Sequence, residues 1–236
     1  MPRRSTTALT ATALCLLALS ACSNSGSTKT GTNPVPAASA PKEAKGDSGA
    51  AAVLSSEELR GRLLTTGDLG AGYAPKPQRN DLRGGGRDDT TVIGCPALER
   101  LGGAGAGGSL DFPRRAKAAF TYTGSRDAEL SVELYSDTVA RLSAGTGRIF
   151  EAMGDCPVYQ VVVGSTPVKV GTQKIPAPGF GDEQWSQMVT FTTGGRESIV
   201  KQTAVRTGAV LVVVSGSPAL VDTHIEKALA KAAPAA

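Results

Sequence analysis

The chain has 236 residues, of which 40% are hydrophobic, 19% charged and only 4% aromatic, and its formal net charge is +4. This length allows one ordinary domain with tails and argues against a large multidomain enzyme. The small net charge gives no sign of the strongly basic surface that is typical of nucleic-acid-binding proteins. One histidine and four cysteines leave little room for a metal cluster, so we expect no metal and no cofactor.

The N-terminus has the pattern of an export signal. Residues 1–4 are basic, and residues 8–21 form an apolar stretch with few polar interruptions. A helix that spans a bilayer needs roughly 20 apolar residues, so this stretch is shorter than a typical transmembrane helix. It is typical of the apolar region of a secretory signal peptide.

The sequence Leu19-Ser20-Ala21-Cys22 resembles the lipobox of bacterial lipoproteins, in which the cysteine thiol receives diacylglycerol after cleavage. The resemblance implies that residues 1–21 are removed and that Cys22 carries the lipid. Two acyl chains suffice for stable attachment to a membrane. We therefore expect a lipid anchor on the extracytoplasmic face of the cell membrane, and the alternative is a plain signal peptide cut near Ala21.

Residues 23–52 are rich in Ser, Gly, Thr, Pro and Ala and contain almost no large apolar side chain. Such a segment cannot bury enough surface to offset the entropy of ordering it. We interpret residues 22–52 as the lipidated cysteine with a disordered tether, and residues 53–236 as one folded domain.

The folded domain is expected to open with a helix. Ser55 and Glu58 have the spacing of a capping box, and the helix should end near Thr65. Residues 67–91 are rich in Gly, Pro, Asp and Arg, which predicts a loop. A second short helix is expected at residues 95–102, because Pro stands at its first turn and Gly just past its end.

Alternating apolar residues predict a hairpin, and later strands are separated by Gly or Pro. Helical spacing predicts a helix at residues 137–153, capped by Ser136 or Asp137 and stopped by Gly154, and a closing helix at residues 218–231. The expected fold is α+β, a mostly antiparallel sheet of about seven strands with packed helices. The predicted strands are residues 117–123, 129–135, 159–163, 168–175, 184–192, 197–205 and 209–215.

Cysteine usage agrees with export. Cys15 lies in the signal peptide and Cys22 receives the lipid, so Cys95 and Cys156 remain as one pair in the domain. In an exported protein such a pair is most often a disulfide. Two free thiols are the alternative, and a zinc site lacks the four ligands that it needs.

The order of these elements resembles the extracellular sensor-like domains of actinobacterial PknH-type kinases and their stand-alone lipoprotein relatives. The resemblance rests first on the lipobox, the tether and the opening helix, which runs into Leu-Leu-Thr-Thr-Gly-Asp-Leu-Gly at residues 63–70 with Tyr73. It rests also on the hairpin, the helix followed by a cysteine, and the final meander of strands. It implies an antiparallel α+β fold with a broad ligand-binding cleft. The family commonly has a second disulfide, for which this domain lacks the cysteines. The excess of Arg over Lys, with abundant Ala and Gly, agrees with an actinobacterial source.

These features favour a non-catalytic ligand-binding or sensor-like module of the cell envelope, which we expect to be a monomer. Candidates for the lining of its cleft are Trp185, Tyr159 and Tyr135. The ligand would be a small molecule or a lipid. The alternative is a structural or interaction lipoprotein that binds an envelope protein. A cell-envelope hydrolase ranks last, because His224 lies on the apolar stripe of a helix and because Asp182 and Glu183 are neighbours at a turn.

Overall fold

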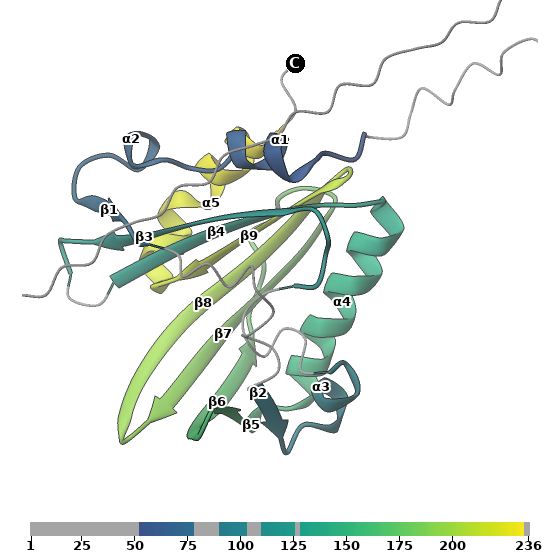
Figure 1. Ribbon diagram of the computed structural model, residues 1–236, viewed down its shortest axis with the longest axis vertical. Helices are drawn as coiled ribbons and strands as arrows, with labels where there is room; N and C mark the ends of the chain where they lie inside the picture. Colours follow the sequence, from purple (N-terminus) through teal and green to yellow (C-terminus); the bar gives the residue numbers. More distant parts are fainter. Residues whose placement is uncertain (1–51, 78–89, 103–109, 126–127, 234–236) are drawn as a thin grey trace, which may run out of the picture. The chain divides into compact units, whose positions relative to one another are not determined.

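The computed structural model of the protein describes residues 52–77, 90–102, 110–125 and 128–233, which belong to one compact unit, Asp47–Ala236. The signal sequence, Cys22 and nearly all of the tether lie outside these residues. The fold is α+β, as predicted, and one antiparallel sheet organises it (Figure 1). Its helices are α1 Ser56–Gly61, α2 Thr66–Leu69, α3 Pro96–Arg100, α4 Val139–Asp155 and α5 Pro218–Ala232.

The sheet has nine strands among the described residues, in the order β1-β3-β4-β9-β8-β7-β6-β5-β2, and every neighbouring pair is antiparallel. The predicted hairpin and the predicted meander of the last three strands are confirmed. The strands are β1 Tyr73–Pro75, β2 Thr90–Ile93, β3 Arg115–Tyr122, β4 Ala128–Ser136, β5 Val158–Val163, β6 Thr166–Lys174, β7 Glu183–Thr193, β8 Arg196–Thr207 and β9 Val210–Gly216.

The sequence-based prediction was wrong in several details. The opening helix has the predicted capping box at Ser55 but ends at Gly61, and a second capping box at Thr65 starts the separate helix α2. Gly154 does not stop α4, which continues through it to Asp155. The N-cap of α4 is Thr138, whose hydroxyl accepts a hydrogen bond from the Arg141 amide.

The sheet has nine strands rather than the predicted seven, because the sequence analysis missed the short strands β1 and β2. They have three and four residues, too few to show an alternating pattern, and both fall within or next to the region predicted as a loop. Each pairs with a longer strand, β1 with β3 and β2 with β5. Tertiary pairing therefore makes these strands, rather than their local sequence.

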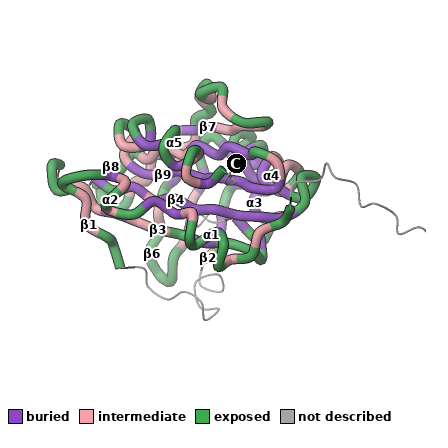
Figure 2. Tube along the Cα trace, turned by 90° about the horizontal axis from the view of Figure 1, so that it is seen from above, coloured by how far each residue is buried: buried purple, intermediate pink, exposed green. Residues whose placement is uncertain are grey.

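The two faces of the sheet carry two separate cores. Helices α1, α2 and α5 cover one face, which we call the α5 face, and its core centres on Leu134, Val205 and Val214. Helices α3 and α4 cover the opposite face, the α4 face. Strands β4 and β9 lie between these layers and are buried along nearly their whole length (Figure 2).

Helices α1, α2 and α5 cover only part of the α5 face. Strand pairing places Val158, Gly171, Thr190 and Ile199 in one row across β5, β6, β7 and β8. Val158 is 55% exposed and Ile199 48%, and Ile93 at the edge of the same face is 49% exposed. The described helices therefore leave three large apolar side chains of this face, Ile93, Val158 and Ile199, in contact with solvent.

Candidate functional site

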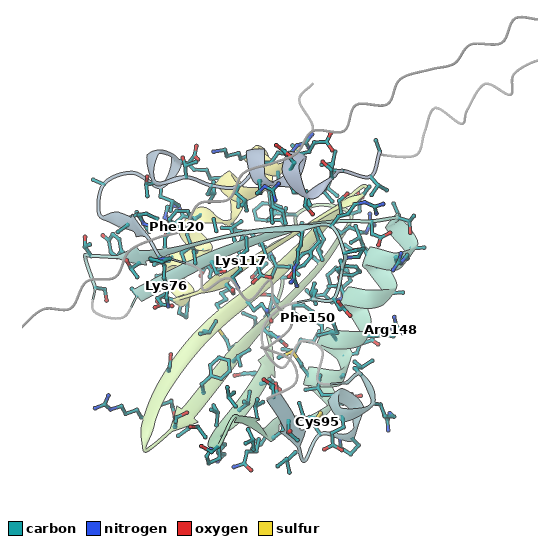
Figure 3. The ribbon with its side chains drawn as sticks, in the orientation of Figure 1. Lys76, Cys95, Lys117, Phe120, Arg148 and Phe150 are labelled. Atoms are coloured by element: carbon teal, nitrogen blue, oxygen red, sulfur yellow. A yellow bond between two sulfur atoms is a disulfide. The ribbon has the colours of Figure 1, made fainter. Side chains whose placement is uncertain are left out.

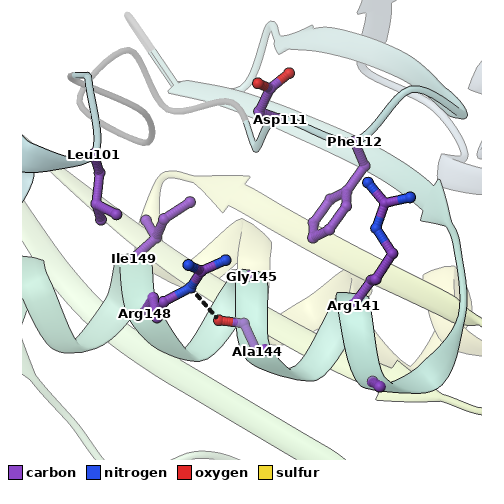
Figure 4. A pocket seen from close by; sticks show the side chains of 9 residues that line it. Leu101, Asp111, Phe112, Arg141, Ala144, Gly145, Arg148 and Ile149 are labelled. Carbon is purple, nitrogen blue, oxygen red and sulfur yellow. Dashed lines mark hydrogen bonds between the residues drawn. The ribbon is translucent and has the colours of Figure 1, made fainter.

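A hollow of about 420 Å³ lies between α4 and the segment that leads into β3 (Figure 4). Its volume falls within the range of sites for small molecules. Two arginines and one aspartate stand among apolar and small residues in its lining. The lining residues are Leu101, Asp111, Phe112, Ala140, Arg141, Ala144, Gly145, Arg148 and Ile149.

The hollow exists because α4 carries small side chains on this side. Ala140 and Ala144 are four residues apart, so they lie on one stripe of the helix, and Gly145 lies beside that stripe. At Gly145 an added Cβ would lie 2.8 Å from Cζ of Phe112, which shows how closely the phenyl ring approaches the helix. The missing side chain of Gly145 therefore leaves the space that the Phe112 ring occupies.

Both arginines stand on the α4 side of the hollow, and Asp111 stands on the opposite side (Figure 4). Arg141 forms an ion pair with the buried carboxylate of Asp137, with Nη1 and Oδ2 3.3 Å apart. Arg148 donates from Nε to the carbonyl oxygen of Ala144 at 3.1 Å. Figure 3 shows Arg148 and Phe150 on opposite sides of α4, so Arg148 points away from the core.

The wall that contains Phe112 is fastened to the sheet by Tyr135. The Leu110 amide donates to the Tyr135 hydroxyl at 3.1 Å, and the rings of Phe112 and Tyr135 meet edge to face with centroids 5.6 Å apart. The Tyr135 hydroxyl donates in turn to the carboxylate of Glu133, which also accepts from Nζ of Lys117 at 2.6 Å. A fully buried side chain thus fixes this wall from beneath.

The wall that contains Leu101 is fastened by a disulfide. The predicted bridge between Cys95 and Cys156 is present, with an S–S distance of 2.10 Å. It joins the residue before α3 to the residue after α4, and Leu101 directly follows α3. Both walls of the hollow are therefore anchored before any ligand arrives.

The three aromatic residues predicted to line a cleft share the α4 face but do not line this hollow. Tyr135 is 0% exposed and Tyr159 is 4% exposed, and burial raises the pKa of Tyr159 to about 12. Trp185 is half-buried, and its ring lies 6.2 Å from that of Phe150 on α4. The two tyrosines are core residues under the helix, and contact of the three rings with a ligand stays a prediction.

His224 is buried on α5, as its place on the apolar stripe predicted. Its Nε2 lies 2.6 Å from the hydroxyl of Tyr73, and the two rings meet edge to face. Burial, followed by the charge of Lys227, lowers the pKa of His224. A neutral imidazole that ties β1 to α5 explains this histidine as a packing residue.

Asp182 and Glu183 both bind the buried guanidinium of Arg206. Nε of Arg206 donates to Glu183 at 2.7 Å, and Nη1 donates to Asp182 at 2.9 Å. The other oxygen of Glu183 accepts from the Ser143 hydroxyl, so the pair also fastens α4 to the sheet. Arg206 and then Ser143 lower the pKa of Glu183, and the Gly208 amide is the main cause of the lowered pKa of Asp182.

In the described ranges no three His, Cys, Asp or Glu side chains come close enough together to hold a metal ion. Nor does any helix in those ranges have the length and apolar character needed to cross a membrane.

The arginines of the hollow were missed by the sequence analysis, which looked for aromatic lining. The signal that could have found them is the stripe Arg141, Ala144, Gly145 and Arg148 on one helix. Small residues between two cations on an exposed stripe indicate a gap beside the helix. The partner wall, Asp111 and Phe112, follows a glycine-rich segment and gave no such signal.

The sequence matches no family model and no curated protein. The fold is similar to the crystal structure of the extracellular domain of PknH from Mycobacterium tuberculosis, with a TM-score of 0.53 and 10% identity, covering 77% of this chain and 97% of that one. A second solved structure, the Rv0999 ortholog of Mycobacterium smegmatis, has a TM-score of 0.39 and 11% identity, covering 69% of this chain and 90% of that one. The similarity to the PknH extracellular domain supports the fold that the order of elements predicted.

Proposed function

We propose that this protein is a lipid-anchored, non-catalytic binding module on the extracytoplasmic face of the cell membrane, and that the hollow beside α4 holds its ligand. The observation that carries the proposal is the hollow itself, whose walls are anchored by Tyr135 and by the disulfide. A concave apolar site with a few charged groups is the usual form of a small-molecule site. The shared fold with an extracellular domain supports the location.

The absence of catalysis is supported by the roles that the candidate catalytic groups already have. Arg206 holds Asp182 and Glu183, and His224 binds Tyr73 in the core. The hydrogen bonds of these groups therefore have a structural role within the protein.

Filling the hollow tests ligand binding. Ala144 is exposed and lines the hollow, so Ala144→Phe places a ring inside it with little disturbance of the core. We expect native mass spectrometry of the mature protein from its source to show a bound small molecule on the wild type and at least a tenfold lower occupancy on the variant.

The matched control is Val139→Phe, because Val139 is an exposed α4 residue that does not line the hollow. This control should keep the wild-type occupancy. Equal occupancy in wild type and Ala144→Phe would contradict the proposed site.

Lipid anchoring is tested separately at Cys22. Cys22→Ala removes the thiol that would carry diacylglycerol, so the variant should leave the membrane fraction and lose the mass of the lipid. Fractionation with immunoblotting and intact-mass measurement give the result. Unchanged membrane retention and processing in the variant would contradict the anchor.

A second candidate function, presentation of a surface to an envelope protein, is favoured by the exposed apolar side chains of Val158 and Ile199 on one face of the sheet. Exposed apolar groups that gather on one face often mark interaction sites. A wild-type mass without any bound molecule would favour this function, and crosslinking in intact cells would then identify the partner.

A further inference from the structure

The charges around the hollow favour an anionic ligand. Arg141 and Arg148 stand about two helical turns apart on α4 and face the same space. The one carboxylate in the lining, Asp111, stands on the opposite wall and has an interaction of its own. The described residues of the lining therefore carry one more positive charge than negative charges.

Arg148 is the arginine that has hydrogen-bond donors available for a ligand. Its hydrogen bond in the structure uses Nε and runs to the Ala144 carbonyl of its own helix, and it forms no ion pair within the part of the chain that the structure describes. Arg141, in contrast, is already paired with Asp137. A guanidinium presents paired donors that match the two oxygens of a carboxylate or phosphate.

The remaining lining suits a hydrocarbon group. Phe112 and Ile149 are each 7% exposed and Leu101 is half-buried, so the hollow has an apolar floor beside its cations. The volume of about 420 Å³ lies within the range of small-molecule sites. That space accommodates a small molecule or one end of a larger one.

We propose that the hollow binds an anionic amphiphile, with its carboxylate or phosphate on Arg148 and Arg141 and its hydrocarbon part against Phe112, Leu101 and Ile149. This inference rests on the proposed function, because it assigns a ligand class to the same hollow. Two sources supply that chemistry, a free fatty acid and a phospholipid headgroup with its chains.

The test is a calorimetric titration of the full mature protein with short-chain probes below their micelle concentrations. Octanoate and octyl phosphate represent the anions, and octyl glucoside and octyltrimethylammonium are the neutral and cationic counterparts. Dihexanoyl phosphatidic acid distinguishes the sources: comparable binding indicates a phospholipid, and binding of the single-chain anions alone indicates a fatty acid. We expect the anions to bind at least tenfold more tightly than the neutral and cationic probes.

Variants then assign the effect to the guanidinium. Arg148→Gln should weaken binding of the anions at least tenfold, since hydrogen bonds between charged groups are the stronger kind, and Arg148→Lys should restore part of it. Octyl glucoside should bind both forms equally. Arg196→Gln, a distant exposed arginine at the turn between β7 and β8, is the control and should bind the anions like the wild type.

The outcomes separate this inference from the proposed function. If octyl glucoside binds as tightly as octanoate, Arg148→Gln changes nothing and Ala144→Phe still abolishes binding, the hollow is a site but the anionic class is wrong. If Ala144→Phe leaves the binding of every probe and the native occupancy unchanged, the proposed site and this inference both fail.

Discussion

Replacing Cys95 and Cys156 together by alanine is expected to lower the free energy of unfolding by about 4 kcal/mol. The bridge spans a sequence separation of 61 residues, and in the chain-entropy account a loop of this length strongly restricts the unfolded chain. A loss of this size is a large share of the 5–15 kcal/mol that typically stabilises a domain. Guanidinium chloride unfolding followed by circular dichroism measures it.

A second experiment, with a reductant, distinguishes the contribution of the disulfide bond to stability from that of the packing of the two cysteine side chains, both of which are buried. Wild-type protein unfolded in the presence of dithiothreitol should lose nearly as much stability as the double variant, and dithiothreitol should leave the double variant unchanged. A loss below about 1 kcal/mol in both arms would contradict the entropic role of the bridge.

Glu183→Ala is expected to cost about 3 kcal/mol, because it leaves the guanidinium of Arg206 buried with one carboxylate fewer. The Arg206 side chain is only 7% exposed, whereas that of Glu183 is 35% exposed and that of Asp182 is 52% exposed. Arg206→Met should therefore cost less than half as much, since the carboxylates can hydrate once the cation is gone. Urea unfolding of each variant measures the difference.

The double variant Glu183→Ala with Arg206→Met makes the test sharper. It should be more stable than Glu183→Ala alone, because the buried cation that had lost one of its two carboxylates has been removed. Glu129→Ala is the control, since its ion pair with Lys76 is about half exposed and should contribute less than 1 kcal/mol. A larger loss from Arg206→Met than from Glu183→Ala would show that the buried charge is not the cause.

Much of the fold was predictable because its long elements carry strong local patterns. Val210–Gly216 is an uninterrupted run of apolar residues up to Ser215, and α4 and α5 repeat apolar residues at helical spacing. The capping box at Ser55 and the turn glycines marked the ends of elements. These signals depend on residues that are close in sequence, so a single sequence contains them.

The hollow was not predictable because its parts are close only in space. Arg148 and Phe112 come from different elements, and the wall at Phe112 depends on a hydrogen bond from Leu110 to Tyr135 that spans 25 positions. An aromatic residue on a strand gives the same pattern in sequence whether it lines a cleft or supports one. Tyr135 was therefore identified as important without its role beneath the wall.

The two shortest strands form the ends of the sheet, and this protects the protein from growing into larger assemblies. Strand β1 has three residues and ends at Pro75, which has no amide hydrogen to donate, and β2 has four. A neighbouring strand that paired with β1 or β2 would find a ladder of only a few hydrogen bonds, too short to hold it. Molecules at high concentration can therefore remain separate although each contains a wide sheet. Fibrillation should begin only after β1 or β2 has detached from the sheet.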